Sequence, residues 1–325
     1  MALYWVQSTD PGAPSLTGQN GSGNLVFDYI LNTIAGLTIQ YTGTNRSVVQ
    51  MPDGSVLRYY HDSAASGNAR FMIVRAAESA SAIDTLVDEF PLTSQVADSL
   101  CNVLVSFSAN ATVRPWWALV DTSTTTSCFH FFNEPETNNI AGGMFWGGGT
   151  QVSSLPVDAY ATVLYTRASA VTTTATGAAT KGVSGFAGTP VNHWLRRSRD
   201  GIVKSCTARA GPYTGGTLLG ITPNGPTYPD PDDGKLRLCK VNILDYYSQS
   251  STTGISPEWV RMWVPRLFQP MHEVSSWASI DNGDTFAASS YDPSAQFAFF
   301  KFGNVSGDGG TLAVQIAGAW AVPSG

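Results

Sequence analysis

Histidines are the first candidates for chemistry in this 325-residue chain, because an imidazole can act as a general base or as a metal ligand. The four of them lie in different stretches of the sequence, at His61, His130, His193 and His272. A catalytic triad would need the fold to bring one of them to a nucleophile and an acid. We favour a simpler interpretation, a hydrogen-bonded histidine at a strand end or at a subunit contact.

The sequence lacks the motifs of several common enzyme classes. No G-x-S-x-G nucleophile elbow occurs, which argues against an esterase of that type. The Gly234-Lys235 pair is followed by a leucine, so it forms no P-loop, and His272-Glu273 lacks the second histidine of a zinc-protease helix. Nothing selects a pair of carboxylates for glycoside cleavage. We therefore expect a protein that is not an enzyme and has no cofactor.

Two acidic segments allow more than one interpretation. Asp230, Asp232 and Asp233 are followed by a glycine, and clustered carboxylates of this kind can bind Ca²⁺. Their spacing differs from that of an EF-hand, because Gly234 stands where a ligand is needed. A turn ahead of a strand explains the segment better, and Asp281–Asp284 likewise predicts a tight turn joining two strands. We expect no bound metal.

Aromatic residues are unusually prominent, with nine Trp and fifteen Phe. Several are sequence neighbours, such as Trp116 with Trp117 and Phe131 with Phe132. Neighbours in a strand point to opposite faces, so the two members of a pair cannot share one core. One member must meet a second layer of the same chain, another subunit, or a sugar that stacks on it.

The sharpest aromatic pair is Phe145-Trp146, which lies between Gly142-Gly143 and Gly147–Gly149. Glycines allow a bulky pair to project from a closely packed backbone. We hypothesise that Phe145 and Trp146 anchor a contact with another chain. The candidate interface residues are Phe145, Trp146, Trp116 and Trp117.

Composition and charge narrow the range of partners. Charged residues make up 13% of the chain, against roughly 25% in a typical soluble domain, so either neutral polar groups dominate the surface or partners cover much of it. The net charge is −6. The nearest basic cluster, Arg196–Arg199, is followed at once by Asp200, and we interpret it as a solvated or interfacial turn. We expect no nucleic-acid partner.

The cysteines and the first residues bear on where the protein is made. None of the four cysteines forms a C-x-x-C pair or has a histidine at zinc-ligand spacing, and each sits in or beside an apolar run: Cys101, Cys128, Cys206 and Cys239. We expect them to be reduced and structural, as in a cytoplasm. The start Met1–Gln7 lacks the features of a signal peptide, and no segment approaches 18 apolar residues, so we expect no membrane partner.

Strand patterns dominate the chain and predict a mainly β protein, built as antiparallel sandwich or barrel-like lobes with a few short helices. The predicted strands are Ser55–His61, Ala69–Ala77, Val103–Phe107, Trp116–Val120, Cys128–Phe132, Ala161–Arg167, Lys235–Tyr247, Gln296–Phe302 and Thr311–Val322. In the last of these, Leu312, Val314 and Ile316 alternate with Ala313 and Gln315, which predicts a strand buried on one face.

The predicted helices are Asn24–Ala35, Ala82–Glu89 and Pro257–Trp263. We expect Ser22 or Asn24 to cap the first helix and Gly36 to end it in the left-handed conformation. Residues 168–190 are mostly Ala, Thr, Gly and Ser, and such a segment cannot bury enough apolar area to fold alone. It predicts a linker or arm between an N-terminal lobe, residues 1–167, and a C-terminal lobe, residues 191–325.

A series of short landmarks resembles a widespread family of structural proteins of tailed-phage virions. In order, they are STDPGAPSLTG (8–18), GSG (21–23), YTGTNR (41–46), RPWWALV (114–120), LLG (218–220), YPDPDDG (228–234), VPRLFQPMH (264–272) and DNGDTF (281–286). They extend over nearly the whole chain. The resemblance implies a component of the particle and no catalytic residue.

The expectation is therefore a structural protein of the virion, made in the cytoplasm of a bacterial host. Repeated copies would form a ring, collar, sleeve or tip in the neck or tail, and the partners would be copies of itself and other virion proteins. A second reading is a tail module that recognises a host-surface glycan through exposed Trp and Tyr. A third is a capsid decoration protein, and an enzyme ranks last.

Overall fold

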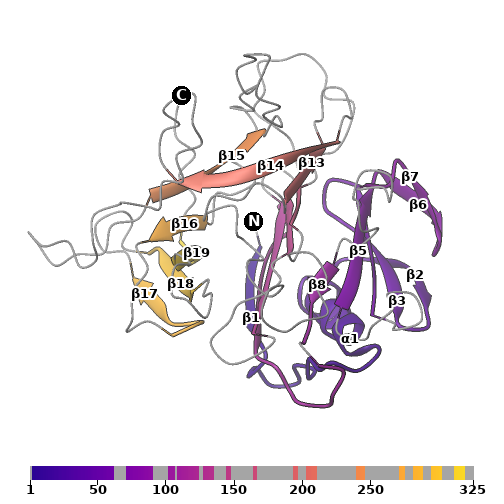
Figure 1. Ribbon diagram of the computed structural model, residues 1–325, viewed down its shortest axis with the longest axis horizontal. Helices are drawn as coiled ribbons and strands as arrows, with labels where there is room; N and C mark the ends of the chain where they lie inside the picture. The colour runs from indigo at the N-terminus through magenta and orange to yellow at the C-terminus, as the bar shows by residue number, and fades with distance from the viewer. Residues whose placement is uncertain are drawn as a thin grey trace, which may run out of the picture.

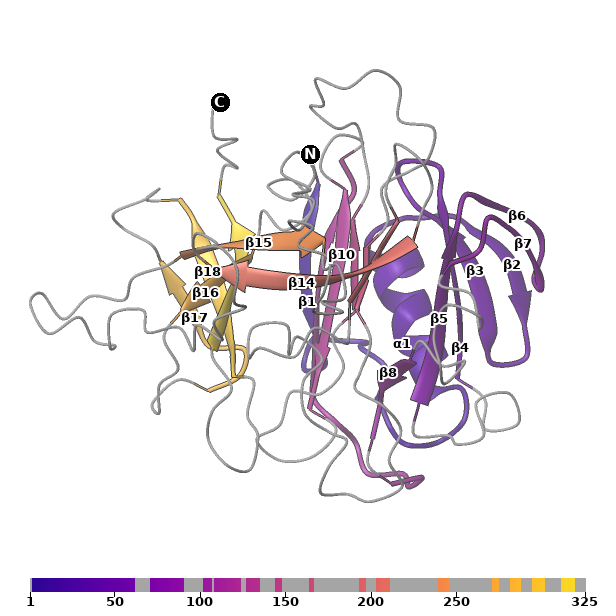
Figure 2. The same cartoon turned by 45° about the horizontal axis from the view of Figure 1, so that its top comes forward.

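The computed structural model describes residues 2–61, 71–90, 102–106, 108–123, 127–134, 144–147, 164–166, 193–196, 203–210, 239–245, 271–274, 281–287, 294–301 and 311–318. Within these residues the protein is strand-rich, with several antiparallel sheets and one short α-helix that continues as a π-helix. The predicted mainly β fold class is confirmed. The sheets lie side by side, with the helix between two of them (Figures 1 and 2).

Three main sheets make up most of the part of the chain that the structure describes. The first sheet has the order β2-β3-β4-β5-β8: Ile39–Gly43, Arg46–Gln50, Val56–Tyr60, Phe71–Ala77 and Asn102–Leu104. The central sheet has the order β1-β9-β10-β11: Leu3–Gln7, Trp116–Asp121, Cys128–Asn133 and Met144–Gly147. The C-terminal sheet has the order β12-β13-β14-β15-β16-β19-β18-β17: Leu164–Thr166, His193–Arg196, Val203–Ala210, Cys239–Asp245, Met271–Val274, Thr311–Ala317, Gln296–Lys301 and Thr285–Ala287.

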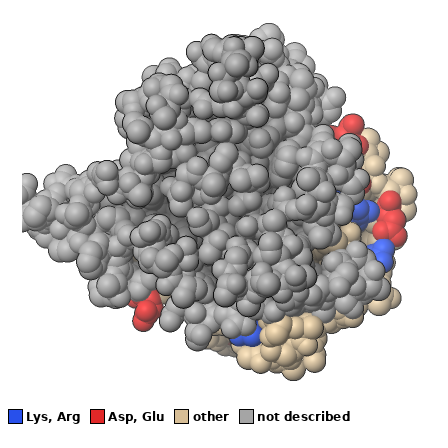
Figure 3. Space-filling view, viewed as in Figure 1, with Lys and Arg blue, Asp and Glu red and all other residues tan. Residues whose placement is uncertain are grey.

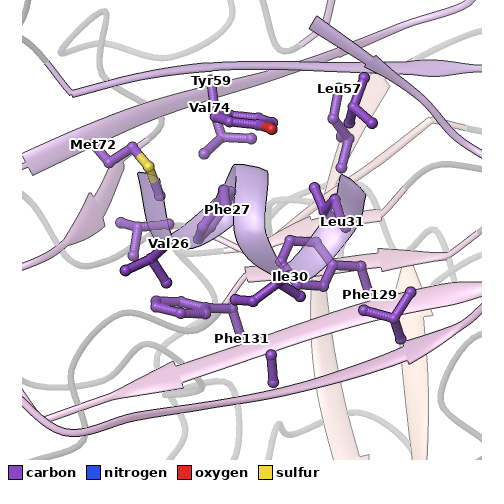
Figure 4. Close-up of a cluster of buried hydrophobic side chains, with 14 of the residues drawn as sticks. Val26, Phe27, Ile30, Leu31, Leu57, Tyr59, Met72, Val74, Phe129 and Phe131 are labelled. Atoms are coloured by element: carbon purple, nitrogen blue, oxygen red, sulfur yellow. The ribbon is translucent and has the colours of Figure 1, made fainter. Parts of the chain in front are cut away.

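The helix fills the space between the first sheet and the central sheet. It runs as α1 over Ser22–Asp28 and as the π-helix η1 over Tyr29–Ile34. Its Phe27 ring contacts Tyr59 of β4, and also Phe129 and Phe131 of β10, with ring centroids 4.9–5.2 Å apart (Figure 4). All four rings are fully buried. The helix has apolar residues at helical spacing because it packs against a sheet on each of two sides.

The two ends of the helix agree only in part with the prediction. The N-cap is Gly21, in the left-handed region at φ 82°, and no side chain caps the helix there. The prediction of Ser22 or Asn24 as the cap is therefore wrong, because both residues lie inside the first turn. The C-terminal prediction is confirmed: Gly36 has φ 69°, and its N–H donates to the Asn32 carbonyl.

The predicted helix Ala82–Glu89 is wrong. This stretch belongs to a small hairpin of β6, Ser79–Ala82, and β7, Thr85–Val87. Its Ile83 and Leu86 are spaced as on a helix, but they pack with Ala80 against buried Val48, Val56 and Ala77 of the first sheet. Tertiary packing has overridden a weak helical pattern here.

All nine predicted strands are present, in places shorter than the apolar run. β4, β5, β8, β9, β10, β12, β15, β18 and β19 each overlap a predicted strand. β19 differs from its prediction in burial, since Val314 and Gln315 are both buried although they alternate along the strand. The expectation of a polar face open to water is therefore wrong for this strand. The predicted helix Pro257–Trp263 lies outside the described residues.

The C-terminal sheet draws on both predicted lobes. β12, in the predicted N-terminal lobe, pairs with β13 through Tyr165 opposite Trp194. The Ala- and Thr-rich segment 168–190 lies outside the described residues, but the strands that flank it are hydrogen-bonded neighbours. Residues 168–190 thus connect two adjacent strands of one sheet.

Candidate interaction surface

The central sheet carries two of the predicted interface residues, Trp116 and Trp117, on opposite faces of β9. Trp116 is fully buried on the helix side, where its ring stacks on Phe131 with centroids 6.4 Å apart. Its indole N–H donates to the Pro14 carbonyl at 3.1 Å. Trp117 is 8% exposed, and its ring meets Phe300 of β18 edge-on at 5.4 Å. Both indoles are therefore covered by other parts of the same chain.

Phe132 repeats this arrangement on β10. Its ring lies parallel to Phe300, with centroids 4.2 Å apart and an interplanar angle of 13°. Trp5 of β1 approaches the same Phe300 ring at 6.0 Å. Rings from three strands of the central sheet thus gather on one residue of the C-terminal sheet, and we call Trp5, Trp117, Phe132 and Phe300 the aromatic seam. The seam is the second layer that the aromatic pairs require.

The other two predicted interface residues lie on β11. Phe145 pairs with His130 and Trp146 with Phe129 across the β10–β11 ladder. Their side chains are outside the described residues, so the hypothesis that they anchor another chain stays a prediction. Trp116 and Trp117 have little area left for another chain, and the other side chains of β9 are buried as well.

A serine and a histidine meet at the start of α1, as a nucleophile and its base would. The Ser22 hydroxyl lies 3.4 Å from His61 Nδ1, but that nitrogen accepts the Gly23 N–H at 2.9 Å. The Ser22 hydroxyl donates to the Thr17 carbonyl at 2.7 Å instead. With its proton committed to a carbonyl, Ser22 is not poised for attack, and the pair fastens the first turn of the helix to the end of β4. His61 is a hydrogen-bonded histidine at a strand end, as predicted.

A second polar cluster joins the helix to the first sheet. The Tyr59 hydroxyl donates to Asp28 Oδ1 at 2.7 Å, and Asn24 Nδ2 donates to Asp28 Oδ2 at 3.0 Å and to Ser47 Oγ at 3.2 Å. Burial, followed by the charge of Asp28, raises the pKa of Tyr59 well above its usual value. The phenol therefore stays protonated and remains a donor. These contacts fix the helix on β3 and β4.

Cys128 and His130 are both fully enclosed on β10. Burial, followed by the charge of Asp121, raises the pKa of the Cys128 thiol well above its usual value, so the thiol stays protonated and is a poor nucleophile. Cys128 is a free, buried cysteine as expected, while the side chains of the other three lie outside the described residues. Burial alone lowers the pKa of His130 from 6.5 to about 3, which keeps its ring neutral.

The acidic segments have different outcomes. Asp281–Asp284 forms the predicted turn, with the Asp284 N–H donating to the Asp281 carbonyl and Gly283 at φ 86°, and it leads into β17. Asp230, Asp232 and Asp233 lie outside the described residues. Across the ranges that are described, no group of three or more His, Cys, Asp or Glu side chains is placed to hold a metal ion. The same ranges contain no helix that is both long and apolar enough to cross a membrane.

Among the described residues, the ion pairs gather where the β6–β7 hairpin meets the outer face of the first sheet. Arg46 Nη1 lies 2.9 Å from Asp84 Oδ1, Arg58 Nη2 lies 2.8 Å from Glu89 Oε1, and Arg75 Nε lies 3.3 Å from the same Glu89 oxygen. Figure 3 shows blue and red atoms side by side at the right edge of the molecule, on the side where Figure 1 places β6 and β7. We call these five residues the arginine cluster.

Tyr60 adds an aromatic ring to the arginine cluster. The guanidinium groups of Arg46 and Arg58 each lie 5.8 Å from the centre of that ring. This distance is within the range of cation–π attraction. The side chains of Arg58 and Arg75 are 12% and 6% exposed, whereas that of Asp84 is 62% exposed. The cluster is thus anchored in the sheet, and its exposed member belongs to the hairpin.

Sequence reasoning missed the arginine cluster, although a signal was present. Arg58 and Arg75 each lie inside a predicted strand whose other residues are mostly apolar or aromatic. A charged residue at such a position marks the outward face of the strand, and the two residues are cross-strand partners. The sequence did not reveal their carboxylate partners, Asp84 and Glu89, because residues 82–89 were predicted to form a helix.

A few large apolar side chains remain at the surface of the described residues. They are Leu25 at 61% exposure, Val113 at 58%, Val87 at 47% and Phe286 at 41%. They come from different elements: α1, the segment before β9, β7 and β17. Single exposed apolar side chains are ordinary on soluble proteins. In an assembly, these four side chains are ones that a neighbouring subunit would cover.

Comparisons with known proteins add no relative. No family model, no curated protein and no solved structure matches this chain.

Proposed function

We propose that this protein is a non-enzymatic structural component of a tailed-phage particle, assembled as repeated copies in the neck, collar, tail or tail tip. The order of the sequence landmarks, which extend from residue 8 to residue 286, carries the assignment to a phage particle. The fold supports a building role through one observation. The aromatic side chains of β9 and β10 are all buried, and they pack the chain against itself on both faces of the central sheet.

The polar clusters support the same role. Ser22 with His61, and Asp28 with Tyr59, hold the helix in place through hydrogen bonds whose donors and acceptors are already matched. Groups paired in this way stabilise a shape and are not free to attack a substrate. The low charge, 13% of residues, favours contacts between neighbours that depend on apolar area more than on ion pairs.

The test is the position of the protein in an intact particle. Purified virions should contain the protein in many copies by quantitative mass spectrometry. A cryo-electron microscopy map should then place it in a ring or tube of the neck or tail. Its absence from purified particles would overturn the proposal. A distal site with side chains open to water would favour the glycan-recognition reading, and contacts to shell subunits would favour a decoration protein.

A further inference from the structure

The β6–β7 hairpin is a peripheral element with a core of its own. Its Ala80, Ile83 and Leu86 are partly buried against Val48, Val56 and Ala77, in a cluster separate from the main core. Of the remaining side chains of β6 and β7, Ser79, Ser81, Thr85 and Val87 are exposed and Ala82 is partly buried. The hairpin lies at the margin of the molecule, over the outer face of the first sheet (Figures 1 and 2). It can therefore detach without disturbing the helix or the central sheet.

The hinge of the hairpin is short and strained. Below it, Ala76 and Phe90 exchange two backbone hydrogen bonds of 2.8 and 3.0 Å, and Phe90 is fully buried in the main core. Above this bridge the chain returns through Asp88, which has φ 53°. The left-handed region is less favourable than extended backbone for a residue with a side chain, although Asp tolerates it better than most residues. Short hinges under strain favour the exchange of an element between copies, because exchange can relieve the strain.

The face that receives the hairpin is matched to it in charge as well as in shape. Asp84, at the tip, binds Arg46 of β3 through both carboxylate oxygens, at 2.9 and 3.1 Å. Glu89, at the base, holds Arg58 and Arg75. A detached hairpin would leave an apolar strip of Val48, Val56 and Ala77 beside a free Arg46. The partner already known to fit both features is an identical hairpin.

We propose that the β6–β7 hairpin exchanges between two copies of this chain, so that each copy's hairpin docks on the first sheet of the other. The inference rests on the proposed self-assembly, and it names one contact through which two copies would bind each other. Exchange recreates every contact of the closed hairpin. The free-energy cost of exchange therefore comes from rearranging the hinge and from bringing two copies together. The hairpin strands are at most four residues long, which spans about 13 Å, so the two copies must lie edge to edge.

A disulfide between copies tests the exchange directly. A Cβ atom built at Gly43 would lie 3.6 Å from Ile83 Cγ1 and 2.9 Å from Arg46 Cγ, so cysteines at positions 43 and 83 come close across the docked hairpin once the Arg46 side chain shifts. One batch of full-length protein carries Gly43→Cys and the other carries Ile83→Cys. After mixing and mild oxidation, we expect a covalent dimer on a non-reducing gel, well above that formed by either batch alone. The same-chain double variant Gly43→Cys/Ile83→Cys is the matched control: its closed form links within one chain and runs as a monomer, whereas its exchanged form runs as a dimer joined by two disulfides.

Charge reversal gives an independent measurement on folded protein. Arg46→Asp and Asp84→Arg each create a mismatched pair in their own chain, whereas reciprocal exchange between the two variants matches both pairs. Native mass spectrometry of a mixture with one isotope-labelled variant should show heterodimer about fivefold above either homodimer, the size of effect expected from exposed ion pairs. The double variant R46D/D84R restores the pair within one chain and should lose this preference.

The outcomes separate this inference from the proposed function. Mixed cysteine variants that give no covalent dimer beyond background, together with charge variants that show no preference for each other, would overturn the exchange. Presence of the wild-type protein in purified particles would still support the structural role in that case. Conversely, exchange in solution by a protein that is absent from particles would leave the hairpin contact standing and remove the phage assignment.

Discussion

Burial determines the protonation of His130, and this has a consequence for stability. Its pKa falls from 6.5 to about 3 in the folded protein. Between these values the unfolded chain binds a proton that the folded chain does not. The free energy of unfolding therefore decreases as the pH falls from about 6.5 toward 3, and it is independent of this residue above pH 6.5.

We predict that His130→Leu removes part of the acid sensitivity. By pH 4 the histidine should cost the wild type on the order of 3 kcal/mol, and a leucine has no proton to bind. Urea unfolding at pH 7 and pH 4 measures the effect as the difference in pH dependence between the two proteins. The carboxylates are common to both and cancel in this comparison. Equal losses in wild type and variant would show that His130 does not set the acid response.

At the level of single residues, the sequence predicted which face of a strand a side chain points to better than it predicted which residues that side chain contacts. The alternation rule correctly required Trp116 and Trp117 to face different layers, and both layers are present within the chain. The rule could not identify Phe300 as the partner on the second face, because Phe300 is nearly two hundred positions later in the sequence. Periodicity describes one element at a time and does not say which other element covers it.

One glycine, Gly283, allows the turn Asp281–Asp284 ahead of β17 to lie close to the central sheet. Gly283 has φ 86°, and a Cβ atom placed there would collide with the indole ring of Trp117. Its N–H donates to the Phe299 carbonyl at 2.8 Å, and Asn282 hydrogen-bonds to Glu134. The turn is thus docked against the central sheet as well as against β18. Both the backbone conformation and the close approach require glycine.

We predict that Gly283→Ala destabilises the protein by about 2–4 kcal/mol, from backbone strain together with overpacking against Trp117. Gly54→Ala is the matched control. Gly54 has φ 92°, but nothing lies within 4 Å of the Cβ position, so it should cost only about 1 kcal/mol. Thermal unfolding of the two variants gives the comparison. Equal shifts in the melting temperature would mean that the contact with Trp117 adds nothing.

Among the elements, strands were predicted more reliably than short helices. Runs such as Trp116–Val120 and Cys128–Phe132 are too apolar to be anything but buried, and their flanking turn residues set their length. The hairpin at 79–87 was missed because Ser81 and Asp84 are placed as the cap and the capping box of a helix would be, and Ile83 and Leu86 also fit a helical spacing. Its true conformation depends on Val48, Val56 and Ala77, which lie elsewhere in the chain. Local propensity contains no information about such partners.

For the whole molecule, the aromatic seam links the sheets that the sequence assigned to two lobes. Phe300 brings its ring against Trp5, Trp117 and Phe132, and the turn at Gly283 adds a second contact. A segment rich in small residues, such as residues 168–190, is predicted to make few packing contacts of its own. It does not reveal whether the parts on either side pack together, because burial between them depends on residues far from the segment.

We predict that Phe300→Ala lowers the free energy of unfolding by about 3–5 kcal/mol, because it leaves a cavity between the sheets. Phe286→Ala, on the neighbouring strand β17, is the control. Phe286 is 41% exposed, so its loss should cost clearly less. Chemical denaturation followed by tryptophan fluorescence measures both. Since Trp5 and Trp117 line the seam, the Phe300 variant should also shift the emission of the folded state to longer wavelength.

The pairing of β1 with β9 has a consequence for synthesis. Leu3–Gln7 finds its partner strand only at Trp117–Asp121, and the Ala2 carbonyl accepts a hydrogen bond from Thr122, 120 residues away. During translation Leu3–Gln7 must therefore stay unpaired until Trp117–Asp121 has left the ribosome. A ribosome-bound intermediate that ends before Trp117 can complete neither the β1–β9 pairing nor the central sheet on which the helix rests. The folding yield of this protein should accordingly depend on what shields Leu3–Gln7 in the interval.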